Sequence, residues 1–286
     1  MAIPETQLQT WCNQGAQQAS AATYTSIQTA LAQHNWPGRM NHIVYLQGSY
    51  PNATNIRGDS DVDVVVESTN VYYDDMPAEV QKQIGWSQGS YSFNDVRREV
   101  ITALTNYYPA GKVKPDKKCI RVAGDGSNRL NADVVPCVTF KHFDGTTHKA
   151  TGIAFWPQEG GLRIVNYPKL HLANGQNKNG ICSYNYKPAI RMFKNARNKA
   201  QTYSLFPSYF LECLLYNAPT HCFVNSRAAT FADVLSWLHE QSQSAGFSLL
   251  RCQNGVQFMF GTAAHQVSEQ DAKRLINDLV TLWNNW

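Results

Sequence analysis

An aspartate pair directly ahead of three valines constrains this chain more than any other feature. Asp61 and Asp63 flank Val62, and the apolar run 64–66 follows. In a β-strand, residues i and i+2 point to the same face, so the two carboxylates lie side by side and the valines at 62, 64 and 66 line the opposite face. Like charges this close are costly unless cations compensate them, and hard divalent ions with oxygen ligands are the usual compensation. The pattern predicts a strand that binds metal.

A glycine–serine pair precedes this strand. Gly48 and Ser49 follow the apolar stretch 43–46, which is typical of a strand that ends in a tight turn. Glycine lets the backbone approach a phosphate, and a short helix after the turn would direct its N–H groups at the anion. The pair therefore predicts a phosphate-binding turn.

An Asp-x-Asp pair alone is common at solvated strand ends. A third carboxylate favours a catalytic site over this interpretation. Asp133 lies in a second β-type run, 131–138, at a position that would more often be aliphatic. Pro136 marks this run as an edge strand or a strand that is ending. Three carboxylates from two adjacent strands can hold two Mg²⁺ ions roughly 3.5–4 Å apart, which activates an attacking hydroxyl and stabilises departing pyrophosphate. The set predicts nucleotidyl transfer; an exposed or salt-bridged Asp133 is the alternative.

These segments resemble the signature of the CD-NTase family, the bacterial relatives of animal cyclic GMP–AMP synthase and oligoadenylate synthase within the polymerase-β-like nucleotidyltransferase superfamily. The likeness rests on Gly48-Ser49, Thr54, Ser60-Asp61-Val62-Asp63 and 132–137, and it continues through 166–169, 186–194 and 207–212. It implies an α+β fold: a polymerase-β-like nucleotidyltransferase core, with a mixed sheet and helices, plus a C-terminal helical lobe and nucleoside triphosphates in the cleft between.

Hydrophobic periodicity organises the rest of the chain. It predicts one long N-terminal helix over 5–33 that bridges both lobes and would extend roughly 40 Å. Strand signals occupy much of 42–165 around a helix at 94–108. After residue 183 the pattern predicts helices at 187–200, 207–217, 230–242 and 268–284, with Thr230 and Ser268 as N-cap candidates for the last two. The Gly- and Asn-rich stretch 173–180 is typical of a loop. We therefore predict two domains, residues 1–180 and 181–286.

The resemblance also implies nucleotide contacts in the helical lobe. Lys194 and Ser208 would hold the triphosphate, and Tyr209 would stack on a base. A compact ammonium, a hydroxyl at a helix start and an aromatic ring suit these roles, although Tyr209 could instead be a half-buried core aromatic. Arg191 shares the helix face of Lys194, and triphosphate binding explains that basic face better than a polynucleotide does. Glu212 is predicted to pair with a nearby Arg or Lys.

Composition limits the function classes. With 43% hydrophobic residues, no apolar run near the ~18–20 residues of a membrane span and no signal peptide, we expect a cytoplasmic protein without a membrane partner. The chain has seven cysteines, an odd number, so a disulfide framework is not indicated. They also lack Cys-x-x-Cys spacing, so a zinc ribbon is not indicated either. The 25 basic and 21 acidic residues form no concentrated basic stripe, which predicts that no DNA or RNA is required.

The resemblance implies a cyclic oligonucleotide synthase that joins nucleoside triphosphates, ATP, GTP or both, into a cyclic di- or trinucleotide second messenger. Asp61 and Asp63 would hold two Mg²⁺ ions, with Mn²⁺ as a substitute, and Asp133 would complete the site where the acceptor hydroxyl is deprotonated. Family membership would place the product in bacterial antiphage (CBASS) signalling, with regulatory proteins of the same defence operon as partners.

Two alternatives stay open. One is a template-independent transferase that makes linear oligonucleotides or modifies RNA or another acceptor. The other is an inactive nucleotide sensor or scaffold, against which the intact acidic triad argues. Base choice, linkage, ring size, oligomeric state, effector and activating signal stay open as well.

Overall fold

The chain folds into two compact units in a computed structural model. The helical unit consists of Met1–Ala16, Pro51–Asp59 and Lys169–Trp286, and the sheet unit of Gln17–Tyr50 and Ser60–Pro168. The structure describes residues 2–15, 17–38, 40–58, 61–83, 85, 89–158, 160–200, 206–263 and 266–286. Both units are discontinuous in sequence. The predicted division at residues 180 and 181 uses a single boundary and so differs from this arrangement.

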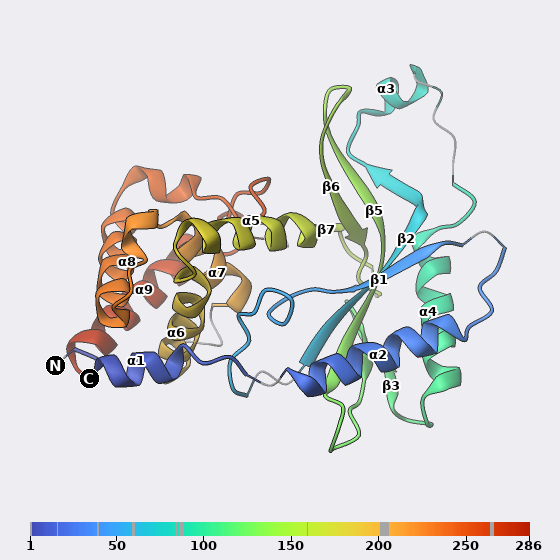
Figure 1. The fold of residues 1–286 in the computed structure, drawn as a ribbon. Helices are drawn as coiled ribbons and strands as arrows, with labels where there is room; N and C mark the ends of the chain where they lie inside the picture. The colour runs from blue at the N-terminus through green and yellow to red at the C-terminus, as the bar shows by residue number, and fades with distance from the viewer. Residues whose placement is uncertain are drawn as a thin grey trace. The chain divides into compact units, whose positions relative to one another are not determined.

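Within the described residues, the sheet unit is built on one mixed sheet of seven strands (Figure 1). The strands are β1 (His42–Leu46), β2 (Asp61–Asp74), β3 (Val113–Pro115), β4 (Ile120–Val122), β5 (Asn131–Asp144), β6 (Thr147–Phe155) and β7 (Ile164–Asn166). β2 and β5 pair in parallel, and β1 pairs antiparallel with β2. β4 and then β3 continue the sheet beside the first half of β5, while β6 pairs with the second half and β7 with β6. The predicted mixed-sheet core is confirmed.

Pro136 lies inside β5, a long interior strand. Its presence had predicted that this strand is at an edge of the sheet or is ending. β4 pairs with β5 only as far as Val134, and β6 pairs with it only from Val138. Position 136 falls in the gap between these two neighbours, and on its other side it is the partner of Val66 in β2. Because proline has no N–H to donate, this gap is where a long interior strand can hold it.

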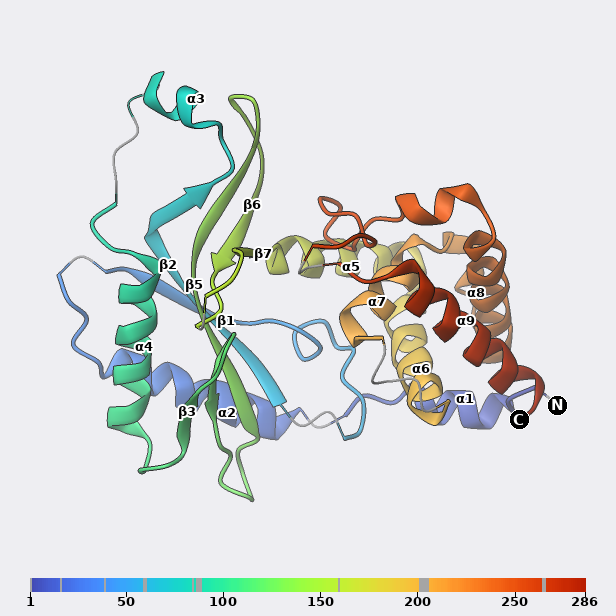
Figure 2. The same cartoon turned by 180° about the vertical axis from the view of Figure 1, so that it is seen from behind.

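Two helices cover one face of this sheet. α2 (Gln18–Ala32) and α4 (Phe93–Tyr107) pack against each other and against β2 and β5 (Figures 1 and 2). α4 begins at a capping box in which Ser92 Oγ accepts from Asp95 N and Asp95 Oδ2 accepts from Ser92 N. The short helix α3 (Ala78–Gln83) follows β2. α4 occupies almost the range predicted from its apolar spacing.

The N-terminal residues form two helices, so the prediction of one long bridging helix is wrong. α1 (Glu5–Trp11) belongs to the helical unit and α2 to the sheet unit. Between them, Gly15 N donates to Asn55 O at 3.0 Å, and a Cβ at position 15 would lie 2.4 Å from Ile56 O. These backbone contacts replace the helical hydrogen bonds at this point, and they require a residue without a side chain.

The helical unit confirms the predicted helical C-terminal part. Besides α1 it contains α5 (Pro168–Ile181), α6 (Tyr186–Lys199), α7 (Ser208–Asn217), α8 (Arg227–Ser242) and α9 (Glu269–Asn284), with 3₁₀ turns at Thr220–Cys222 and Ala245–Leu249. Its core stacks Phe231 between Phe193 and Trp283, at ring-centroid distances of 4.4 and 5.1 Å. Ser268 caps α9 as predicted, but α8 is capped by Ser226 and not by Thr230.

The stretch 173–180 is helical, which corrects the prediction of a loop. Asn174 Nδ2 donates to Gln253 O at 2.8 Å, and buried Lys178 donates from Nζ to Ala218 O at 2.6 Å and to Tyr216 O. Glycine and asparagine have weak helix propensity, so these tertiary contacts override it. No helix in the described part of the chain is long and apolar enough to cross a bilayer.

Candidate active site

Asp61 and Asp63 stand at the start of β2, as the alternating pattern predicted. Asp61 is exposed and Asp63 half-buried, whereas Val62 and Val64 on the opposite face are fully buried. Ser60, which precedes them in the sequence motif, lies outside the described residues. The strand therefore presents two carboxylates on one side and anchors them by apolar burial on the other.

Asp133 lies beside Asp63 because β5 runs parallel to β2 in the register that pairs these two residues. The same register pairs Asn131 with Asp61, and Asn131 Nδ2 donates to Asp61 Oδ1 at 3.3 Å. Partners in adjacent strands are about 4.8 Å apart along the hydrogen-bonding direction. Three aspartates thus share one face of two neighbouring strands.

Arg121 and Cys119 surround the third aspartate. Arg121 is the β4 partner of Asp133; its Nε lies 4.0 Å from Asp133 Oδ1, and its Nη2 lies 2.9 Å from Asp116 Oδ2. Burial raises the pKa of Asp133; a hydrogen bond from Cys119 opposes this, and the charge of Asp61 adds to it. Burial and then the charge of Asp133 raise the pKa of the Cys119 thiol to about 12, which keeps that thiol protonated as a donor.

The aspartates fit a hard divalent ion by their chemistry, since carboxylate oxygens are the ligands that Mg²⁺ prefers. Among the described residues, however, no three Asp, Glu, His or Cys side chains converge closely enough to hold an ion as they stand. Carboxylates repel one another when no cation lies between them, and the positive charge nearest to Asp133 comes from Arg121. Metal binding would therefore require the three side chains to move toward one another.

The Gly48 turn is built against Asp63. Gln47 N donates to Asp63 O at 3.0 Å, and Gly48 has a left-handed φ of 73°. A Cβ at position 48 would lie 2.4 Å from Asp63 Oδ2, so both conformation and space demand glycine. Ser49 follows in a half-buried turn. The short helix expected after it does not form, because Ala53 has a φ of 54° that a right-handed helix cannot contain.

Lys194 is enclosed within the helical unit. Only 1% of it is exposed, and its Nζ lies 2.7 Å from Glu212 Oε1 and 3.1 Å from Thr54 O. Thr54 Oγ1 also donates to Glu212 Oε1 at 2.7 Å, and His171 Nε2 lies 3.2 Å from Glu212 Oε2. The predicted pairing of Glu212 with a basic residue is confirmed. The ammonium expected to hold the triphosphate is committed to this internal network.

Two arginines of α6 are also used internally. Arg191 Nε donates to Cys12 O at 2.5 Å, and its Nη1 donates to Ala53 O. Arg197 Nη1 donates to Phe206 O at 3.0 Å and to Ser208 Oγ at 3.1 Å. The face predicted to bind phosphate thus holds segments of the helical unit together.

Ser208 and Tyr209 open α7. Ser208 is half-buried and accepts the hydrogen bond from Arg197. The Tyr209 ring stacks on His171 with centroids 5.1 Å apart and planes 28° apart, and its hydroxyl accepts from Asn254 Nδ2 at 3.1 Å. Tyr209 remains 37% exposed. It is anchored on one ring face and still open to solvent in part, so this geometry suits either of the two roles considered for it.

Three residues near these groups carry no role in the sequence-based prediction: Arg121, Asn131 and His171. Asn131 precedes Asp133 by two residues, so strand alternation could have placed its side chain with the acidic set. Arg121 could not be found in this way, because its place opposite Asp133 depends on the register of β4 on β5. His171 lies on α5, in a part of the chain whose helix the sequence pattern did not reveal.

A mixed sheet with three aspartates on adjacent strands and a glycine turn packed against one of them defines a nucleotidyltransferase. Residues 173–284 match the family model described as the cGAS/DncV-like nucleotidyltransferase C-terminal helical domain. The cyclic UMP-AMP synthase of Rhodothermus marinus is 41% identical over 100% of this chain and 99% of its own. The cyclic nucleotide synthase CdnE01 of Staphylococcus haemolyticus is 33% identical over the whole of both chains.

The fold leads to the same group of proteins. The solved structure of the Rhodothermus marinus CdnE c-UMP-AMP synthase with Apcpp and Upnpp matches with a TM-score of 0.91 over 99% of this chain and 97% of that one, at 41% identity. The chain belongs to the CD-NTase family, and it is a nucleotidyltransferase of the cyclic nucleotide synthase type. Its substrates are nucleoside triphosphates.

Proposed function

We propose that this chain joins UTP and ATP into a cyclic dinucleotide by metal-dependent nucleotidyl transfer. The observation that carries the chemistry is the parallel register that pairs Asp63 with Asp133 and leaves Asp61 on the same face. The choice of bases is supported by 41% identity, over the full length, to a cyclic UMP-AMP synthase. It adds UTP to the purine substrates expected from the sequence.

Each carboxylate has a proposed role. Asp61 and Asp63 bind Mg²⁺, or Mn²⁺ in its place, and Asp133 completes the acidic set beside the acceptor hydroxyl. Divalent ions held there would lower the pKa of that hydroxyl and neutralise charge on the departing pyrophosphate. The hydroxyl loses its proton to water, its oxygen forms a bond to the α-phosphorus of the donor, and the bond from that phosphorus to pyrophosphate breaks. A second transfer closes the ring.

The phosphate and base contacts are proposed from the turns and helix starts that carry them. Gly48 and Ser49 offer backbone N–H groups and a hydroxyl beside the acidic residues, where a triphosphate would need donors. In the helical unit, Ser208 contributes a hydroxyl and Tyr209 a partly exposed ring for stacking. Lys194 is held by Glu212 and by the carbonyl group of Thr54, so direct contact with a phosphate would require it to leave Glu212.

Membership of the CD-NTase family supports a second-messenger role for the product in bacterial antiphage (CBASS) signalling, with regulatory proteins as partners. A transferase that makes linear oligonucleotides would use the same acidic residues. The products separate the two, because a cyclic dinucleotide has no terminal phosphate for a phosphatase to remove.

The test is incubation of the protein with radiolabelled ATP, GTP, CTP and UTP, singly and in pairs, with Mg²⁺, followed by phosphatase treatment and mass analysis. We expect a phosphatase-resistant product with the mass of one UMP and one AMP unit, formed only when UTP and ATP are both present. A phosphatase-sensitive ladder would favour the linear transferase. Triphosphate binding without any product would favour the inactive sensor.

The acidic set is tested by replacing Asp61→Asn and Asp63→Asn together. We expect synthesis to be abolished and the free energy of unfolding to stay equal or rise slightly, because the substitution removes repulsion between carboxylates. Asp144→Asn is the matched control, since Asp144 lies on β5 with Asp133 but near its far end, with a side chain that is 79% exposed. Synthesis at the wild-type rate by the double variant would contradict the proposed site.

A further inference from the structure

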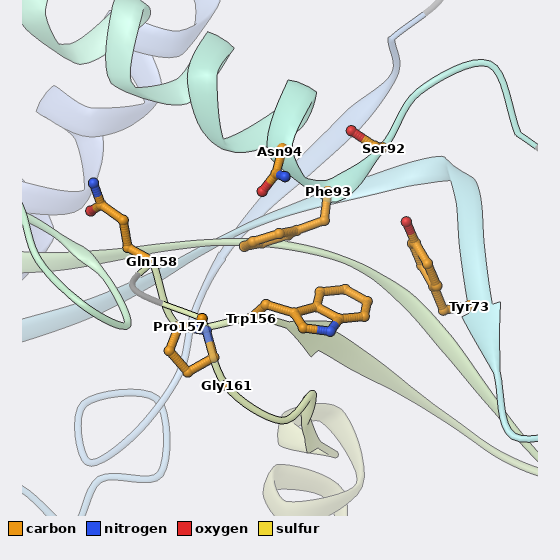
Figure 3. Close-up of a pocket in the computed structure, with 9 residues that line it drawn as sticks. Tyr73, Ser92, Phe93, Asn94, Trp156, Pro157, Gln158 and Gly161 are labelled. Carbon is orange, nitrogen blue, oxygen red and sulfur yellow. The ribbon is translucent and has the colours of Figure 1, made fainter.

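A pocket of the sheet unit, with a volume of about 330 Å³, lies away from the aspartates. Tyr73 lines it near the end of β2, whereas Asp61 and Asp63 stand at the start of that strand. The pocket is also lined by Phe93 and Asn94, in the first turn of α4. Trp156 and Gln158, in the segment after β6, line it as well (Figure 3). The catalytic proposal uses none of these side chains.

Three aromatic rings form the walls. The ring centroids of Tyr73 and Trp156 are 4.8 Å apart at 63°, and those of Phe93 and Trp156 are 5.3 Å apart at 46°. Phe93 is buried, while Tyr73 and Trp156 are half-buried and border the open space shown in Figure 3. Gly160 and Gly161 line the same pocket and place no side chain in it. The space can therefore accept a flat ring against aromatic surfaces.

Two amides supply the polar groups. Gln158 Oε1 accepts from Arg97 Nη2 at 3.0 Å, which ties this amide to a buried arginine of α4. The Asn94 side chain is exposed and makes no hydrogen bond with any residue that the structure describes. Of the described residues that line the pocket, none is charged. This lining offers donors and acceptors to a neutral molecule and no counter-charge to a phosphate.

We propose that this pocket binds the base of a purine nucleoside, with adenosine as the representative ligand. Every base has a π-face that stacks on aromatic side chains. Asparagine and glutamine amides match the donor and acceptor pattern along the edge of adenine. The volume lies at the lower end of the about 300–1,000 Å³ typical of small-molecule sites, which suits one nucleoside better than a cyclic dinucleotide.

The experiment titrates adenosine into the full chain in EDTA by calorimetry, so that neither metal nor triphosphate contributes. We expect one saturable binding event, which persists when Asp61 and Asp63 are both replaced by asparagine. Trp156→Leu should weaken binding at least tenfold because it removes the central wall, and Asn94→Ala should weaken it several-fold. Tyr107→Leu is the matched control: Tyr107 is also a partly exposed aromatic, and it lies at the end of α4 opposite to Phe93 and Asn94.

The proposal is overturned if adenosine shows no saturable binding up to millimolar concentration. It is equally overturned if binding keeps its wild-type affinity in Trp156→Leu, since adenosine would then occupy another site. Should Trp156→Leu fail to fold, Asn94→Ala decides the question, because Asn94 is exposed and its loss leaves the packing of the sheet unit intact.

Discussion

Two acidic residues of this protein pair with basic residues in different surroundings, one exposed and one buried. Asp133 faces Arg121 across 4.0 Å, and the arginine side chain is 66% exposed. Exposed pairs of this kind contribute about 0–1 kcal/mol, so this partner can be exchanged for another cation. Glu212 and Lys194 are both buried at 2.7 Å, and removing one partner of such a pair costs about 3–5 kcal/mol. The first arrangement suits ligand binding, and the second maintains structure.

Gly48→Ala should reduce synthesis by about a hundredfold, because displacement of a catalytic group by about 1 Å has effects of that size. The new methyl group would lie 2.4 Å from Asp63 Oδ2. Gly111→Ala is the matched control: its φ of 79° also costs an L-residue about 1–2 kcal/mol, but nothing lies within 4 Å of its Cβ. Steady-state synthesis and urea denaturation of both variants separate the two effects. Equal activity in the two would contradict the role of Gly48 beside Asp63.

Glu212 should make the helical unit sensitive to acid. Burial raises the pKa of Glu212, but the charge of Lys194 and the hydrogen bond to His171 outweigh burial and hold the pKa at about 2, below its ordinary 4.5. The stabilisation is therefore complete above about pH 4.5 and is lost as the pH falls toward 2. At about 1.36 kcal/mol per pH unit, this difference corresponds to roughly 3 kcal/mol of unfolding free energy.

Urea denaturation between pH 7 and 3 measures this dependence. We expect Glu212→Gln to be less stable than wild type at pH 7, since Lys194 keeps its buried charge, and to lose less stability on acidification. Glu240→Gln, at an exposed position of α8, is the control and should keep the wild-type slope. An unchanged slope in Glu212→Gln would show that other groups control acid unfolding.

At the scale of elements, contacts decide where helices form as much as propensity does. α5 contains two glycines and three asparagines, yet it is helical because one side of it is buried. Gly175 on this side approaches Gln253, whose Nε2 in turn donates to His171 O at 2.8 Å. A small residue is needed at that point of the helix. Gly180, near the end of α5, has open space around its Cβ position.

Alanine substitutions in α5 should therefore have opposite effects. Gly180→Ala should stabilise the protein by about 0.5–1 kcal/mol, the ordinary advantage of alanine over glycine within a helix. Gly175→Ala gains the same propensity, but its Cβ would lie 2.4 Å from Gln253 Nε2, so we expect a net loss of stability. The midpoint of urea denaturation, at constant m-value, reports both. Stabilisation by Gly175→Ala would show that Gln253 yields without cost.

The strands show the same dependence on neighbours. Asp133 can act with Asp63 only because β5 pairs with β2 in parallel and in this register. A shift of one residue would turn Asp133 to the other face of the sheet and expose the valines that anchor it. The burial of Val134 and Val138 on β5 therefore supports the position of the acidic set.

At the scale of the whole molecule, the net charge is small and part of the basic charge is internal. The net charge is +4, from 25 basic and 21 acidic residues. Basic side chains that donate hydrogen bonds to carbonyl groups within the fold include Arg97, Lys178, Arg191, Lys194 and Arg197. Neutralising many phosphates requires a concentrated basic surface, and internal side chains cannot contribute to one.

Synthesis should therefore need no DNA or RNA. We expect nuclease-treated protein to make its product at the same rate with and without added duplex DNA or RNA. The assay is repeated at two salt concentrations, because binding to nucleic acid weakens steeply as salt rises. A strong stimulation by either polymer that disappears at higher salt would contradict this prediction.

The sequence by itself determined what depends on neighbouring residues. Strand alternation placed Asp61 and Asp63 on one face, and helical spacing located α4, α6 and α9 within a residue or two. These features are local because side-chain direction repeats every two residues in a strand and every 3.6 in a helix. The shared face of Asp61 and Asp63 could be predicted for this reason, whereas the place of Asp133 beside Asp63 depends on the register of β5 on β2.

Only the tertiary structure decided what depends on residues distant in the chain. The N-terminal residues form two helices because residues 55 and 56 approach the backbone of Gly15, between α1 and α2. The stretch 173–180 is helical because Gln253 and the carbonyl groups at 216 and 218 bind it. Lys194 is buried because Glu212 lies opposite it. Each outcome depends on a contact between residues at least 18 positions apart in the chain (212 − 194 = 18 for Lys194 and Glu212). Local propensity carries no information about such a contact.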